Sequence, residues 1–93
     1  MVEEVVSAET LVKRLKRVEG QIRGIQKMIE NGRDCESIIT QLGAVRSAIE
    51  GVGVLVLSNY MKLCLRGGSE TELDSTNSLM RAVAIWSRAR VGD

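Results

Sequence analysis

Six apolar residues near the start of the chain are spaced alternately four and three positions apart. They are Leu11, Leu15, Val18, Ile22, Ile25 and Ile29. Residues at these intervals share one face of an α-helix, so the spacing predicts a packed amphipathic helix from about Ser7 to Asn31. The pair Asn31-Gly32 is a typical C-terminal stop for such a helix.

Proline is absent from the 93 residues, so the helix ends must come from glycine and from capping residues. A second helix is expected from Asp34, a favourable N-cap, to about Leu65. A third helix is expected to fade near Val91, and Ser69 with Glu72 fits a capping box at its start. The predicted fold class is therefore all-α.

The three helices are expected to form one domain over residues 1–93, with a long second helix. The stretch 52–58 is rich in β-branched residues, but it has no evident hairpin partner and is interpreted as helix. Gly51 and Gly53 each weaken that helix by roughly 1 kcal/mol relative to Ala. A helix of about 30 residues measures about 45 Å, which is long for so small a subunit and suggests a helix shared between subunits.

Basic residues gather on the face of the first helix that lies opposite the apolar residues. They are Lys13, Lys16, Arg17, Arg23 and Lys27, with Arg14 at the margin. Gly20 and Gly24 lie on this face too, where the close approach of a partner to the backbone is one reason for glycine. The face is either an ordinary solvated surface or a phosphate-contacting surface, and Arg46 of the second helix could extend it.

The chain holds two cysteines, Cys35 and Cys64, and no histidine. On one helix their sulfur atoms would lie roughly 43 Å apart, at 1.5 Å per residue, yet on the same face, which also carries Tyr60. An antiparallel second copy, centred near Ile49 and Glu50, would bring Cys35 of one chain to Cys64 of the other. The spacing therefore predicts an intersubunit thiol pair, against the alternative of two buried structural cysteines.

Facing thiols allow more than one chemistry. Two thiolates can hold Cu(I), whereas a tetrahedral zinc site would lack two ligands and Tyr60 is a poor third ligand for a soft ion. The thiols can instead act as a redox pair, in which one forms a persulfide or sulfenic acid and the other attacks it to close a bridge. A helix N-terminus favours the thiolate of Cys35, but Asp34 and Glu36 oppose it. Lys62 and Arg66 favour the thiolate of Cys64, but a helix C-terminus opposes it, so the choice of nucleophile stays open.

The run RLKRVEGQIRGIQKMIENGRDCESIITQL, residues 14–42, resembles the copper-sensitive operon repressor (CsoR/RcnR-type) family of bacterial transcription factors. The resemblance extends over nearly all of the chain. It implies an all-helical subunit and an antiparallel dimer that assembles into a dimer-of-dimers tetramer. It also implies a DNA-binding repressor that leaves its operator when an effector binds.

Branches of this family differ at the sensing positions. Copper sensors carry Cys, His and Cys where this chain has Cys35, Tyr60 and Cys64, and nickel or cobalt sensors need several histidines. The pattern, with Asp34 before the first cysteine, is most similar to the persulfide-sensing CstR-like branch. A basic residue that several relatives carry in the second helix corresponds here to Gly51.

The combined prediction is a cytoplasmic, homotetrameric repressor that binds double-stranded operator DNA when it is reduced. Reactive sulfur species are expected to bridge Cys35 to Cys64 of the partner and release the DNA, without a cofactor. The expected DNA-binding residues are Lys13, Arg14, Lys16, Arg17, Arg23, Lys27 and Arg46. No enzyme and no membrane span are expected, because acid–base groups do not converge and no apolar run reaches about 18 residues.

Two alternatives stay open. One is a Cu(I)-responsive repressor with Cys35 and Cys64 as the metal ligands. The other, from a different class, is a helical assembly module without DNA binding.

Overall fold

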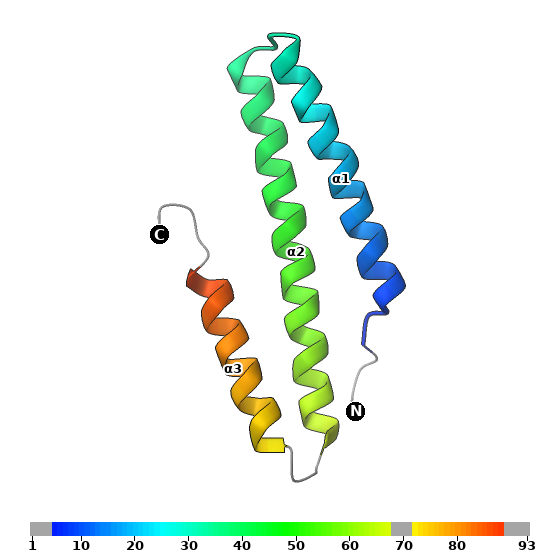
Figure 1. Cartoon of the computed structure of the whole chain (residues 1–93), viewed down its shortest axis with the longest axis vertical. Helices are drawn as coiled ribbons and strands as arrows, with labels where there is room; N and C mark the ends of the chain where they lie inside the picture. The colour runs from blue at the N-terminus through cyan, green and yellow to red at the C-terminus, as the bar shows by residue number, and fades with distance from the viewer. Residues whose placement is uncertain (1–4, 68–71, 89–93) are drawn as a thin grey trace. The chain divides into compact units, whose positions relative to one another are not determined.

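Three α-helices make up the described chain (Figure 1). The computed structural model describes residues 5–67 and 72–88, with side chains over 5–63 and 76–88. The helices are α1 (Ala8–Glu30), α2 (Cys35–Gly67) and α3 (Glu72–Arg88), and the described residues form no strand. The prediction of an all-α chain with a long second helix is confirmed.

Side chains cap the first two helices, and the cap at Asp34 confirms the prediction made for the second. The Ser7 hydroxyl accepts a hydrogen bond of 3.1 Å from the Thr10 N–H, which is one of the free donors at the start of α1. The Asp34 carboxylate accepts one of 2.9 Å from the Ser37 N–H at the start of α2. Between the helices, Gly32 has a φ of 70°, a left-handed conformation that glycine adopts without steric cost.

The end of α2 differs slightly from its prediction, and the predicted bounds of the third helix cannot all be compared with the structure. Helix α2 continues past the predicted end at Leu65 to Gly67. The interpretation of 52–58 as helix is confirmed. The predicted capping residue Ser69 and the expected fading near Val91 lie outside the described residues.

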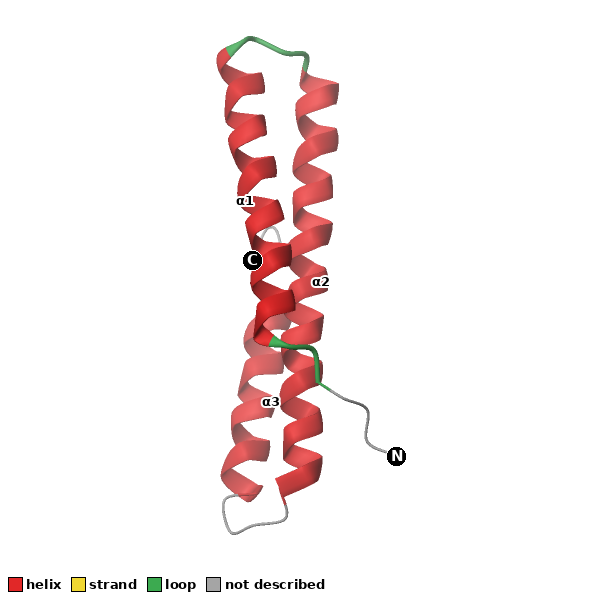
Figure 2. Cartoon of the chain, turned by 90° about the vertical axis from the view of Figure 1, so that its right-hand side faces the viewer, coloured by secondary structure: helices red, strands yellow, loops and turns green. Residues whose placement is uncertain are grey.

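Two compact units divide the chain, and α2 contributes to both. One unit is Ser7–Val52, in which α1 and the first part of α2 run antiparallel (Figure 1). The other consists of Gly53–Asp93 with Met1–Val6, and in its described part α3 runs antiparallel to the end of α2 (Figure 2).

The core of the unit Ser7–Val52 is small and aliphatic. Val18 and Ile25 of α1 are buried against Val45 of α2, and Ile38 and Ala48 pack around them. Burial of such side chains is the main favourable term in the packing of the two helices.

Only part of the predicted apolar face of α1 is packed in this way. Leu15, Ile22 and Ile29 are 44%, 41% and 59% exposed in the single chain, so the described residues leave this part of the predicted face uncovered. A single neighbouring helix covers a stripe narrower than the whole apolar face. The subunit therefore leaves an apolar surface uncovered on α1.

Two contacts between residues distant in sequence lie within the described part of the other unit. Asn59 of α2 exchanges two hydrogen bonds with the main chain of Val6. Trp86 of α3 packs against the backbone at Gly53 of α2, where a Cβ atom would lie 2.5 Å from the indole. Gly53 thus costs helix propensity but provides the space in which α3 docks.

The first part of α2 is unusually apolar for a helix with so much exposed surface. The stretch Cys35–Leu63 has a mean hydropathy of 1.3 over its most apolar window, of which 11% is buried. By length and composition alone it could cross a membrane, a test that core helices of soluble proteins also pass. No uninterrupted apolar run of about 18 residues occurs in this stretch, as expected, because charged and polar residues are scattered through it.

Candidate nucleic-acid interface and sensing cysteines

The basic residues of α1 all face solvent. We call them the cationic face: Lys13, Arg14, Lys16, Arg17, Arg23 and Lys27. Across residues 5–63 and 76–88, no carboxylate forms an ion pair with any of them or with exposed Arg46 of α2. Their charges are therefore available to an external anion, and their net effect is a row of cations on one side of a helix.

Two glycines interrupt the cationic face in mid-helix. A Cβ atom at Gly24 would meet nothing within 4 Å, and one at Gly20 would meet only the Arg23 guanidinium at 4.0 Å. Packing within the subunit therefore does not require glycine at either position. Because glycine weakens a helix interior, a reason for it must be sought outside the subunit.

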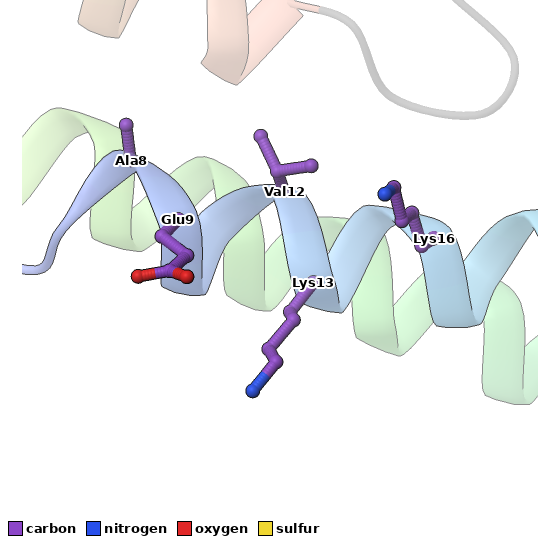
Figure 3. Close-up of a pocket in the computed structure, with 5 residues that line it drawn as sticks. All are labelled: Ala8, Glu9, Val12, Lys13 and Lys16. Carbon is purple, nitrogen blue, oxygen red and sulfur yellow. The ribbon is translucent and has the colours of Figure 1, made fainter.

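A shallow hollow marks the N-terminal end of the cationic face. Ala8, Glu9, Val12, Lys13 and Lys16 line it, all on the first turns of α1. Figure 3 shows Val12 pointing to one side of the helix while Glu9 and Lys13 extend to the other. Lys13, Lys16 and Glu9 thus share this hollow with an exposed valine, near the helix end whose free N–H groups favour anions.

The first predicted sensing residue, Cys35, is an exposed free thiol and the first residue of α2. Its neighbour Asp34 accepts hydrogen bonds of 2.9 Å from the Ser37 N–H and the Ser37 hydroxyl. The N–H of Ser37, followed by its hydroxyl, lowers the pKa of Asp34 below the usual carboxyl value. A full negative charge therefore stands beside Cys35 at neutral pH, with the Arg33 guanidinium 4.0 Å from it.

The second predicted sensing residue, Cys64, lies in the last turns of α2, and its side chain is outside the described residues. Tyr60, one turn earlier, is 52% exposed. No group of three or more potential metal ligands occurs within the part of the chain that the structure describes. The pairing of Cys35 with Cys64 of a second copy stays a prediction, as does a role for Tyr60.

Exposed apolar side chains follow one face of α2. Leu42 and Ile49 are 43% and 40% exposed, and Val56 and Leu63 continue the row at seven-residue intervals. Cys35 lies seven residues before Leu42, so it shares this face. A face of this kind is typical of a helix that packs against another copy or chain.

The sequence patterns missed Asn59, which in the structure forms two hydrogen bonds to the start of the described chain. A polar residue inside the apolar stretch VLVLSNYM was the available signal. Polar groups that are shielded from water normally have hydrogen-bond partners, and the partly buried Asn59 amide has two.

Comparison with known proteins places the chain among repressors. A family model described as a metal-sensitive transcriptional repressor matches residues 7–85. The copper-sensing transcriptional repressor CsoR of Bacillus subtilis is 42% identical over 57 residues, 61% of this chain and 56% of the relative. RicR of Mycobacterium tuberculosis, also a copper-sensing transcriptional repressor, is 42% identical over 57 residues, 61% of this chain and 59% of the relative. The matched stretch spans little more than half the length of these curated relatives.

Solved structures agree over more of the chain. The nickel-responsive transcriptional regulator InrS is 35% identical with a TM-score of 0.76, covering 90% of this chain and 97% of that one. The copper-sensing repressor CsoR with Cu(I) from Geobacillus thermodenitrificans is 33% identical with a TM-score of 0.71, covering 92% and 95%.

Proposed function

The chain belongs to the metal-sensitive transcriptional repressor family, and from this membership we propose that it is a cytosolic transcriptional repressor and not an enzyme. It binds double-stranded operator DNA and releases it when an effector reaches Cys35 and Cys64. The unpaired cationic face of α1 is the single observation that carries the DNA-binding part of this proposal.

DNA binding through this face has a measurable electrostatic signature. Each phosphate that a cation neutralises contributes a slope of about −0.9 to the dependence of log affinity on log salt concentration. We expect Lys16→Gln to reduce the slope by about that amount and to weaken binding to all sequences alike. Arg33→Gln is the matched control, because Arg33 lies outside the cationic face beside Asp34.

A different outcome would favour the helical assembly module. If the reduced protein shows no DNA affinity even at low salt, where phosphate contacts are strongest, the cationic face is an ordinary solvated surface.

Self-association is the second part of the proposal. The exposed row Leu42, Ile49, Val56 and Leu63 is apolar, and a two-fold antiparallel partner would cover it with the same row. We assign the apolar character of Cys35–Leu63 to this interface and not to a lipid bilayer. Two such dimers then form the tetramer.

Reactive sulfur species are the effector that we favour, because the chain has no histidine and carries Tyr60 between its two thiols. One cysteine thiolate takes the outer sulfur of an organic persulfide, RSSH, and releases the thiolate RS⁻. The partner's thiolate then attacks the inner sulfur of the resulting protein persulfide and expels HS⁻. The persulfide is the two-electron oxidant, and the products are one disulfide, one thiol and hydrogen sulfide.

Non-reducing electrophoresis after treatment with an organic persulfide tests this step. A covalent dimer should appear, and the operator affinity of the treated protein should fall. Cys35→Ala should prevent both changes, and an unchanged response in Cys35→Ala would exclude the bridge as the sensing event.

A Cu(I)-responsive repressor is the second candidate, and the copper-sensing relatives favour it. The two thiolates suit Cu(I), which accepts low coordination numbers, but they fall short of a nickel or zinc site. Cu(I) titration against a competing chelator separates the candidates. Tight binding of one Cu(I) per subunit with loss of DNA affinity would replace the sulfur effector by copper.

A further inference from the structure

One side-chain amide holds the start of the described chain to α2. The Val6 N–H donates a hydrogen bond of 2.8 Å to Asn59 Oδ1, and Asn59 Nδ2 donates one of 2.8 Å to the Val6 carbonyl. Both bonds are partly buried. Asn59 therefore satisfies both main-chain polar groups of Val6, as a neighbouring β-strand would. We call this pair of bonds the amide clamp.

The amide clamp adjoins the first turn of α1. Val6 is bonded directly to Ser7, whose hydroxyl accepts from the Thr10 N–H at 3.1 Å and whose carbonyl accepts from the Leu11 N–H at 3.1 Å. Lys13, the first residue of the cationic face, follows in the next turn. Val6 is therefore one peptide bond away from the residue that caps α1.

At its other end the amide clamp adjoins the predicted sensing residues. Asn59 immediately precedes Tyr60 and lies five positions before Cys64 on the same continuous helix. A rigid helix carries a shift of one turn to the next, because each turn is hydrogen-bonded to its neighbours. Hydrogen bonds weaken steeply with misalignment, so a shift or rotation of the helix that reaches Asn59 would weaken the clamp.

We propose that the amide clamp is formed in the DNA-binding state and opens when Cys64 becomes bridged, so that Asn59 couples the sensing end of α2 to α1. The proposal rests on the proposed function. Asn59 acts as a positioning residue, and it contacts neither DNA nor effector.

The chemistry of the clamp demands an amide. Asn supplies one acceptor and one donor, Asp at neutral pH supplies only an acceptor, and Leu of similar size supplies neither. The test therefore compares the parent with Asn59→Leu and Asn59→Asp. Thr40→Val is the matched control. It removes the 2.8 Å hydrogen bond from the Thr40 hydroxyl to the Glu36 carbonyl within α2, which is remote in sequence from Val6.

The readout is the ratio of operator affinities before and after persulfide treatment, measured by mobility shift on the intact assembly. A parent ratio of about 5- to 150-fold would be typical of allosteric coupling. Asn59→Leu should lower the affinity of the reduced protein and bring the ratio close to one, while still forming the covalent dimer. Asn59→Asp should give an intermediate ratio, and Thr40→Val the parent ratio.

Hydrogen exchange provides a second measurement that serves even if Asn59→Leu fails to assemble. The amides of Thr10 and Leu11 donate hydrogen bonds to Ser7. When Cys35 is bridged to Cys64 of the partner in the parent protein, hydrogen exchange at these two amides should become faster. Slow exchange at both amides after complete bridging would overturn the proposal, as would a parent-like ratio in Asn59→Leu. A parent that binds operator in neither state would instead contradict the proposed function itself.

Discussion

Trp86 of α3 rests so closely on Gly53 of α2 that no side chain fits between them. A Cβ atom at Gly53 would lie 2.5, 2.7 and 2.8 Å from Cζ2, Cη2 and Cε2 of the indole. Real Cβ atoms do not approach other atoms to such distances, so glycine at position 53 is a condition for the observed docking of α3.

Replacement of this glycine should destabilise the protein, although alanine is the better helix former. Overpacking of a well-packed contact costs about 1–3 kcal/mol, whereas the gain in helix propensity is about 1 kcal/mol. We expect Gly53→Ala to lower the free energy of unfolding in urea, followed by circular dichroism. Gly51→Ala should raise it, because a Cβ there would meet nothing within 4 Å. Shifts of the same sign in both variants would contradict the packing.

A charge at Ile49 should dissociate the assembly. Ile49 is 40% exposed in the subunit, so an aspartate there keeps the subunit fold but would be unpaired in an apolar interface. Sedimentation velocity should show smaller species for Ile49→Asp at chain concentrations at which the parent is oligomeric. Exposed Ser47 lies on another side of α2, and Ser47→Asp should sediment like the parent.

Alanine at the glycines of the cationic face should have opposite effects on stability and on DNA binding. Gly20→Ala and Gly24→Ala fill open space, so each should stabilise α1 by up to about 1 kcal/mol. If a phosphate backbone approaches the helix at these positions, each added methyl should also reduce operator affinity. Gly43 also lies in open space, but on α2. Gly43→Ala should therefore stabilise its helix without changing operator affinity. Unchanged DNA affinity in all three variants would show that the two glycines have no part in DNA contact.

Asp34 should make the start of α2 sensitive to acid. Hydrogen bonds from Ser37 lower the pKa of Asp34 in the folded chain, so this carboxylate stabilises the fold above pH 3.8, its usual pKa. The contribution is lost as the pH falls through the lowered value. Asp34→Asn keeps a capping oxygen without a titrating group, so its thermal midpoint should fall less with acid. Asp34→Ala should be less stable at every pH, and equal acid dependence in parent and Asp34→Asn would contradict this role.

Local sequence patterns were sufficient to predict the helices and the N-terminal cap of the second helix. The spacing from Leu11 to Ile29 predicted α1, and Asp34 was identified as the cap of the second helix, because capping involves residues only three positions apart. The same patterns could not separate buried Val18 from exposed Ile22. Which side of an apolar face is covered depends on how many helices surround it.

Long-range contacts were beyond the reach of such patterns. Asn59 looked like an isolated polar residue, and its partner Val6 lies 53 positions away. Gly53 looked only like a weak point in α2 until the structure brought Trp86 onto it. The cysteine pair is a prediction of a different kind, since it requires a second copy and cannot be formed by one subunit.

The position of Trp86 also gives the protein an intrinsic optical probe. It is the only tryptophan of the chain, which has one tyrosine and no phenylalanine. Its fluorescence therefore reports the environment of one site, the contact of the Trp86 indole with Gly53, without contributions from other indoles. Detachment of α3 from α2 during assembly, bridging or unfolding could be followed in unlabelled protein from the emission of this one side chain.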